Sequence, residues 1–186
     1  MRIALAAIAV AALLVFAGFR YTGARNRLLN QRQEIRTQWT EVDSAMQRRA
    51  DLITSLVGPS AGHPLERDTV SQIIDARTAL AGAATPKDKM AAYDRLNAAI
   101  SRLLVIVGKD RRLRAGAKLS HLPDDVSNTE NEVNIARQKY NEALQTYNTT
   151  LQLFPNNIVA AVSGFRRNDE YIHTEASAGE VPKGQF

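Results

Sequence analysis

The chain has 186 residues, a formal net charge of +5 and no cysteine. The lack of cysteine excludes disulfides, thiolate metal sites and a lipid attached to cysteine. Aromatic residues make up only 6% of the chain. Apolar residues recur at helical spacing and never alternate with a period of two over any useful length, which predicts an all-α fold.

The first predicted element is the apolar run over residues 3–19, which lies between Arg2 and Arg20 and carries no charge. As a helix this run is roughly 25 Å long, at the short end for a hydrocarbon core of about 30 Å. Flanking arginines can reach the headgroups by snorkelling and make up the difference. We therefore predict a transmembrane anchor over residues 1–20.

A cleaved signal peptide is the alternative for the same run, because Val15, Phe16 and Ala17 form an acceptable cleavage site. The run is longer than the usual hydrophobic region of a signal peptide, which favours an uncleaved anchor. A buried core helix is disfavoured because the run is apolar on every side. Cleavage would release a soluble helical domain that is periplasmic or secreted.

The predicted orientation follows from the basic residues after the run. Five arginines follow it, with only Glu34 opposing them: Arg20, Arg25, Arg27, Arg32 and Arg36. Such charges tend to remain cytoplasmic. We therefore predict a single-pass membrane protein whose N-terminus is outside and whose main domain is cytoplasmic.

The first long helix is predicted over residues 21–57. Its seam combines two seven-residue series offset by four, as in coiled coils and helical bundles: Leu28, Ile35, Val42 and Leu56 with Arg49, and Trp39, Met46 and Ile53 with Arg32. We expect Trp39, Met46 and Ile53 to belong to the core. Truncation of a buried Trp39 to alanine would cost roughly 3–5 kcal/mol.

A break rich in glycine and proline at residues 58–64 ends this helix. We interpret residues 65–107 as one antiparallel return that is interrupted around Gly82–Thr85. It restarts where Thr85 precedes Pro86, because threonine is a favoured N-cap and proline a favoured first helical residue.

The last long helix is predicted to begin at Pro123, after a basic loop over residues 109–118. Its seam repeats every seven residues in two series: Val126, Val133, Tyr140, Tyr147 and Phe154, and Glu130, Arg137, Leu144 and Leu151. We expect Tyr140, Tyr147 and Phe154 to belong to the core.

Pro155 ends the last long helix, and a short helix follows through Val162 and stops at Gly164. Residues 174–186 are small and polar, and we predict a disordered tail. Residues 21–173 then form one helical-bundle domain of three long runs.

An up-down-up course of these runs makes the first and last helices parallel. We therefore predict an inter-helix ion pair between Arg32 and Glu130, which lie near the same ends of their seams. Arg49, beside Arg48, is either a side chain that snorkels past the edge of the core or a member of an ion pair that fixes register.

The same course returns the basic loop to the bilayer. We predict a lipid-headgroup site made of the cations on both sides of it: Arg20, Arg25, Arg27, Lys109, Arg111, Arg112 and Arg114. Each cation near an anionic leaflet contributes about 1 kcal/mol. The alternatives are a solvated loop, which also includes Lys118, and contact with nucleic acid or an acidic partner. Few aromatics are interleaved with these charges, which disfavours single-stranded nucleic acid.

Several motifs occur in a fixed order along the chain. Residues 39–53 contain W-x-x-V-D and R-R-x-D-L-I. The later part contains Thr129-Glu130, Ile135, Arg137, Tyr140-Asn141, Tyr147-Asn148, Phe154-Pro155, Val159-Ala160 and Gly164-Phe165. In this order the motifs resemble the LemA family of bacterial membrane-anchored helical proteins.

The resemblance covers about residues 20–172. It implies a long antiparallel helical bundle behind one N-terminal helix in the bacterial cytoplasmic membrane, and it brings no established biochemical activity. The chain departs from the family pattern at residues 58–64 and 108–122. We therefore expect an earlier first break and a looser loop before the last helix.

The sequence contains no P-loop, dinucleotide-binding glycine motif or nucleophile elbow. Its histidines, His63, His121 and His173, lie near turns or the end of the ordered chain, without a partner at metal-ligand spacing. We expect no enzyme activity, metal, cofactor, small-molecule substrate or nucleic acid. The predicted function is a membrane-anchored, non-enzymatic helical scaffold that contacts the lipid bilayer and a protein partner.

Overall fold

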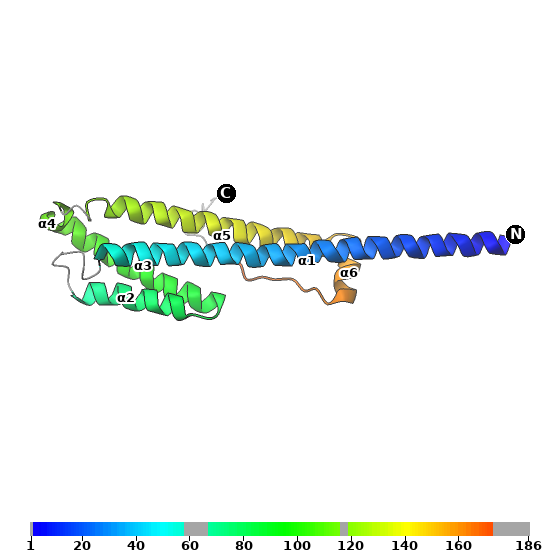
Figure 1. Cartoon of the computed structure of the whole chain (residues 1–186), viewed down its shortest axis with the longest axis horizontal. Coiled ribbons are helices and arrows are strands. Elements are labelled where there is room, and N and C mark those ends of the chain that lie inside the picture. Colours follow the sequence, from blue (N-terminus) through cyan, green and yellow to red (C-terminus); the bar gives the residue numbers. More distant parts are fainter. Residues whose placement is uncertain (1, 58–66, 116–118, 173–186) are drawn as a thin grey trace, which may run out of the picture. The chain divides into compact units, whose positions relative to one another are not determined.

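The computed structural model describes residues 2–57, 67–115 and 119–172 of the chain (Figure 1). The elements in these ranges are all helices: α1 (Arg2–Val57), α2 (Arg67–Gly82), α3 (Pro86–Lys109), α4 (Arg111–Ala115), α5 (Leu122–Gln152) and α6 (Asn156–Ser163). The prediction of an all-α fold with one long apolar N-terminal helix is confirmed. The predicted break at 58–64, with His63, and Lys118, His173 and the tail lie outside the described residues.

The chain divides into two compact units. Unit 1 comprises Met1–Trp39 and Arg137–Phe186, and unit 2 comprises Thr40–Ala136. The two longest helices, α1 and α5, each contribute one part to unit 1 and the other part to unit 2.

In unit 1, α1 and α5 run antiparallel. Gln31 donates a hydrogen bond from Nε2 to Thr150 Oγ1 at 2.9 Å, while the rings of Trp39 and Tyr140 lie edge to face with centroids 5.7 Å apart. The residue number therefore rises on one helix as it falls on the other. The prediction that the first and last helices are parallel is wrong.

In unit 2, α2 and α3 pack side by side as a hairpin (Figure 1). Thr85 caps α3, accepting a hydrogen bond at Oγ1 from the Asp88 backbone N–H at 3.1 Å, and Arg102 Nη1 donates to Gln72 Oε1 at 2.7 Å across the pair. The expected N-cap is therefore present. The interpretation of residues 65–107 as a single return is wrong, because the chain reverses between α2 and α3.

This extra reversal explains the antiparallel course of α5. In unit 2 the pairs Asp43–Lys89 and Arg49–Tyr93 rise together along α1 and α3, so these two helices are parallel. A helix that follows α3 and packs beside it in the opposite direction is then antiparallel to α1. The predicted return of the basic loop to the bilayer required the helix before it to run opposite to α1, which α3 does not do.

Most of the seam residues are in the core. On α1 and α5 the following side chains are buried: Leu28, Ile35, Val42, Met46, Ile53, Val126, Val133, Tyr140, Leu144 and Tyr147. Trp39 is only half-buried, because two packed helices cover only part of an indole. Phe154 is 79% exposed, so its assignment to the core is wrong; α5 ends at Gln152, and the helical repeat no longer positions the residues beyond it.

Candidate functional site

The N-terminal part of α1 is an exposed apolar helix. The large side chains from Ile3 to Phe19 are all exposed, and the span window contains no buried residue. By length and composition this helix can cross a membrane, and a signal sequence would pass the same test. Soluble proteins rarely leave so large an apolar surface uncovered.

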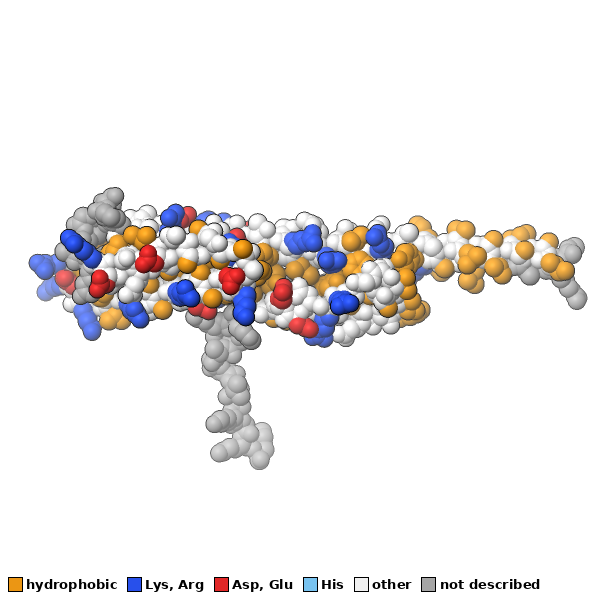
Figure 2. Space-filling model, turned by 90° about the horizontal axis from the view of Figure 1, so that it is seen from below, with side chains coloured by type: hydrophobic (Ala, Val, Ile, Leu, Met, Phe, Trp, Pro, Cys, Tyr) orange, Lys and Arg blue, Asp and Glu red, His pale blue; other side chains and the backbone are white. Residues whose placement is uncertain are grey.

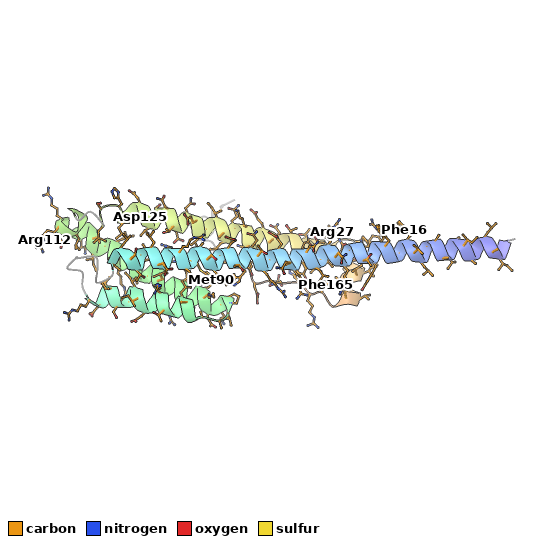
Figure 3. The ribbon with its side chains drawn as sticks, viewed as in Figure 1. Phe16, Arg27, Met90, Arg112, Asp125 and Phe165 are labelled. Atoms are coloured by element: carbon orange, nitrogen blue, oxygen red, sulfur yellow. The ribbon has the colours of Figure 1, made fainter. Side chains whose placement is uncertain are left out.

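The predicted lipid-headgroup residues fall in both units. Arg20, Arg25 and Arg27 are exposed on α1, directly after the apolar segment; Figure 3 shows Phe16 and Arg27 before and after its end. The other four are in unit 2, where Lys109 ends α3, and Arg111, Arg112 and Arg114 form part of α4. The basic loop therefore contains a short helix. Only the three arginines of α1 directly follow the apolar segment, and the headgroup site stays a prediction.

A buried polar cluster joins three helices of unit 2. Arg49 on α1 donates from Nη1 to Tyr93 Oη on α3 and forms an ion pair with Glu130 on α5. Tyr93 donates in turn to Glu130 Oε2 at 3.1 Å, and the Arg49 guanidinium lies 5.5 Å from the centroid of the Tyr93 ring. The Arg49 side chain is only 4% exposed. It therefore belongs to an ion pair between helices and does not snorkel past the edge of the core.

Glu130 does not form the predicted ion pair with Arg32. In unit 2 the described partners of Glu130 are Arg49 and Tyr93, while in unit 1 the Arg32 guanidinium lies over the Phe165 ring at 5.8 Å from its centroid. The prediction chose the wrong arginine because it assumed parallel first and last helices. A seam arginine and a seam glutamate do pair, and the arginine is one that the sequence had already singled out.

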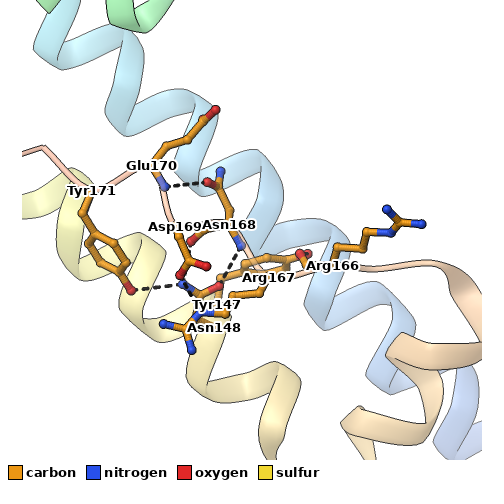
Figure 4. Close-up of polar contacts among 8 residues, drawn as sticks. All are labelled: Tyr147, Asn148, Arg166, Arg167, Asn168, Asp169, Glu170 and Tyr171. Carbon is orange, nitrogen blue, oxygen red and sulfur yellow. Dashed lines mark hydrogen bonds and ion pairs between the residues drawn. The ribbon is translucent and has the colours of Figure 1, made fainter.

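Residues 165–172, here called the C-terminal strap, follow α6 and lie along α5 in unit 1. Asn148 Oδ1 accepts from the Asn168 backbone N–H at 3.0 Å, and its Nδ2 donates to the Asn168 carbonyl at 2.6 Å (Figure 4). Asn141 makes the same pair of bonds with Ile172, at 2.9 and 2.6 Å. Each asparagine side-chain amide thus forms the two hydrogen bonds that the backbone of a neighbouring strand would form in a sheet.

The spacing of the two asparagines fits an extended strap. Seven residues of helix rise about 10.5 Å, and four extended residues span at most about 13–14 Å. Tyr147 adds a third attachment by donating from its hydroxyl to the Arg166 carbonyl at 3.0 Å. No role was predicted for these asparagines, although the Tyr-Asn pairs repeated seven residues apart on α5 were a usable signal.

An open pocket of about 340 Å³ lies in unit 1 beside the strap. It is lined by Arg32, Ile35, Arg36, Tyr147, Gly164, Arg166 and Asn168. Three of the lining residues are arginines and none is acidic, so its electrostatic environment favours anions over cations. Gly164, the C-cap of α6, has φ 72°, a left-handed conformation that suits glycine and turns the chain into the strap.

Two tyrosines on α5 have shifted pKa values. Burial, together with the smaller effect of the Glu170 carboxylate, raises the pKa of Tyr140 to about 12. Burial also raises the pKa of Tyr147, and the positive charge of Arg32 opposes this shift. Both groups are therefore neutral hydroxyls at physiological pH and act as packing and hydrogen-bonding groups.

Metal ligands do not gather within the described part of the chain: residues 2–57, 67–115 and 119–172 contain no group of three or more His, Asp or Glu side chains that could hold a metal ion. His121 is an exposed residue at the start of α5, where its carbonyl accepts from the Asp125 backbone N–H at 2.9 Å.

The sequence model of the LemA family matches residues 38–186. This match confirms the resemblance carried by the ordered motifs from Trp39 onward. No curated protein matches the chain.

Proposed function

The chain belongs to the LemA family, and we propose that it is a membrane-anchored, non-enzymatic helical scaffold that binds a protein partner. One observation carries this proposal. α1 is a single helix of 56 residues whose first part is apolar and uncovered, while its later part, from Leu28 onward, is buried along one seam.

An uninterrupted helix is a stiff connection between a lipid span and a packed domain. A flexible tether would place Gly, Ser or Pro residues between the two, and α1 instead stays helical through Arg20 and Tyr21. Within unit 1, the helix itself then sets the position of the packed residues relative to the bilayer. Such coupling suits a protein that presents a surface to another protein near a membrane.

The use of the polar side chains supports a scaffold rather than an enzyme. Arg49 and Glu130 are paired with each other and with Tyr93 between helices, and Asn141 and Asn148 bind backbone groups of the strap. These groups hold elements together. We accordingly propose no cofactor, no small-molecule substrate and no nucleic-acid ligand.

For the location we propose the bacterial cytoplasmic membrane, with the N-terminus outside and the packed domain in the cytoplasm. The exposed Arg20, Arg25 and Arg27 support this orientation, because basic residues near a span remain cytoplasmic. The alternative is a periplasmic or secreted domain released by cleavage near Ala17. Labelling of single cysteines on each side of the span with an impermeant reagent distinguishes a cytoplasmic packed domain from a periplasmic one.

Alkaline carbonate extraction of bacterial membranes tests the anchoring. The intact chain should stay in the pellet, and Leu13→Arg should release a substantial fraction, because arginine at the centre of a span costs about 2.5–3.5 kcal/mol on insertion scales. Leu29→Arg is the matched control, since Leu29 is an exposed leucine after the span, and it should stay in the pellet. Release of the unmodified chain would overturn the anchoring.

Site-specific photo-crosslinking in native membranes tests the partner. A crosslinker at an exposed position such as Val105 should give one reproducible product of fixed mass, which mass spectrometry identifies. Probes at several exposed positions that give no product would overturn the binding role and leave the anchoring intact.

A further inference from the structure

We propose that the exposed apolar face around α6 enters the membrane interface beside the α1 span, as a second contact with the lipid. The face consists of Leu153, Phe154, Ile158 and Val162 and is here called the α6 patch. This inference rests on the proposed anchoring and adds to it a named lipid-binding surface on the packed domain.

The α6 patch is large and uncovered within unit 1. Phe154 and Val162 are 79% and 73% exposed, and Leu153 and Ile158 are each more than half exposed. The opposite side of the same short helix is buried through Val159 and Ala160. α6 therefore has an inner apolar side that is buried and an outer apolar side that is largely exposed within the described residues of unit 1, whereas a surface helix in water usually has a polar outer side.

A direct contact places α6 beside the end of the apolar segment of α1. Tyr21 Oη and Ser163 Oγ are 2.9 Å apart and hydrogen-bonded. Tyr21 comes two residues after Phe19, the last residue of the apolar run, and Ser163 is the last residue of α6. Figure 2 shows hydrophobic side chains gathered on this part of the surface. If the bilayer surrounds the run that ends at Phe19, α6 lies at the level of its interface.

The local charges fit an interfacial position. From residue 151 to residue 165 the chain carries no charged side chain, so no acidic group opposes contact with anionic headgroups and no ion has to be desolvated. Arg20, Arg25 and Arg27 project from the same end of α1 and can bind the headgroups around the patch. The α6 patch lies beside the end of the span through the Tyr21–Ser163 contact, which favours lipid as its occupant over a second protein surface.

Site-directed spin labelling of the full chain in nanodiscs of phosphatidylethanolamine and phosphatidylglycerol tests the inference. The chain has no cysteine, so single variants Ile158→Cys and Val162→Cys can be labelled without further changes. The matched control is Gln145→Cys, an exposed position on α5 in the same unit. Leu13→Cys, within the apolar segment, reports separately on anchoring. Circular dichroism confirms that each variant keeps its helix content.

The readout is the ratio of label collisions with oxygen, which concentrates in lipid, to collisions with a water-soluble nickel complex. We expect this ratio to be at least threefold higher at positions 158 and 162 than at 145. Equal ratios at the three positions, with a lipid-like ratio at 13, would overturn the α6 contact and leave the anchoring intact. A water-like ratio at 13 would overturn both. Spin–spin broadening between copies at 158 or 162 would assign the patch to a second copy of the chain and overturn the lipid contact.

Discussion

Asn148 binds both backbone polar groups of Asn168 through its side-chain amide, at 3.0 Å from the N–H and 2.6 Å from the carbonyl. Asn148 is buried on α5, so the strap is attached to the helix by groups that water cannot easily replace. An alanine at this position leaves both backbone groups without their partner, and burial makes that costly.

The first prediction is that Asn148→Ala destabilises unit 1 by about 1–3 kcal/mol and loosens the strap. Hydrogen exchange should speed up in peptides that cover residues 165–172. Asn131→Ala, an exposed asparagine on the same helix, is the control and should change neither quantity. Unchanged exchange in Asn148→Ala would show that the asparagine does not hold the strap.

The second prediction concerns the buried ion pair of unit 2. Glu130→Ala leaves the Arg49 guanidinium, only 4% exposed, without its carboxylate, and we expect a loss of about 3 kcal/mol, at the low end for a broken buried pair because Glu130 is partly exposed. The double variant Arg49→Met with Glu130→Leu should lose less than Glu130→Ala, because no charge remains buried. Thermal unfolding in mild detergent measures both.

Glu132→Ala is the control for this pair, since Glu132 is exposed on the same helix, and it should change stability by less than about 0.5 kcal/mol. If Glu130→Ala behaved like Glu132→Ala, the ion pair would have no structural role.

The third prediction concerns Trp39, whose indole is half-buried and packs against Tyr140. Trp39→Ala should cost about 1–2 kcal/mol, less than the cost of truncating a buried tryptophan, because the site opens to solvent and leaves no closed cavity. A double-mutant cycle with Tyr140→Ala should give a coupling of about 0.5–1.5 kcal/mol for the edge-to-face contact. A coupling near zero would mean that the two rings do not interact.

The fourth prediction is a loss of stability at alkaline pH. An unfolded tyrosine ionises near pH 10, and in the folded chain the pKa of Tyr140 is about 12. Between these values the unfolded chain has released the proton while the folded chain still holds it. The contribution of Tyr140 is therefore complete below about pH 10 and falls as the pH rises toward 12, by at most about 1.4 kcal/mol per pH unit.

Unfolding followed from pH 8 to 11.5 checks this window. Tyr140→Phe should make stability depend less on pH above 10. Equal slopes in Tyr140→Phe and the unmodified chain would contradict the assignment.

Local features of the fold could be predicted from the sequence. The apolar run, the α1 seam, the Thr85 N-cap and the Gly164 stop each depend on residues close together in the chain, and their spacing determines their structure. The reversal between α2 and α3 could not be predicted in the same way. A short break after Gly82 fits a kinked helix as well as a hairpin, because both keep the same apolar periodicity.

The wrong partner assigned to Glu130 follows from that reversal, whereas the other two errors in the candidate site have local causes. The partner of Glu130 depends on helix direction, so a wrong direction selected Arg32 in place of Arg49. The strap depends on Asn141 and Asn148, which bind backbone groups; the seven-residue spacing of the two Tyr-Asn pairs marks their positions but does not say which segment they bind. The α6 patch was hidden because the seven-residue repeat assigned Phe154 to the core, whereas α5 ends before it.

The intact mass of the full chain after extraction from carbonate-washed bacterial membranes tests the central claim most directly. The account predicts a membrane-bound species whose mass includes residues 3–19, because α1 spans the bilayer and continues into the packed domain. A species found in the wash, with a mass that lacks about the first 17 residues, as cleavage after Ala17 would give, would contradict it.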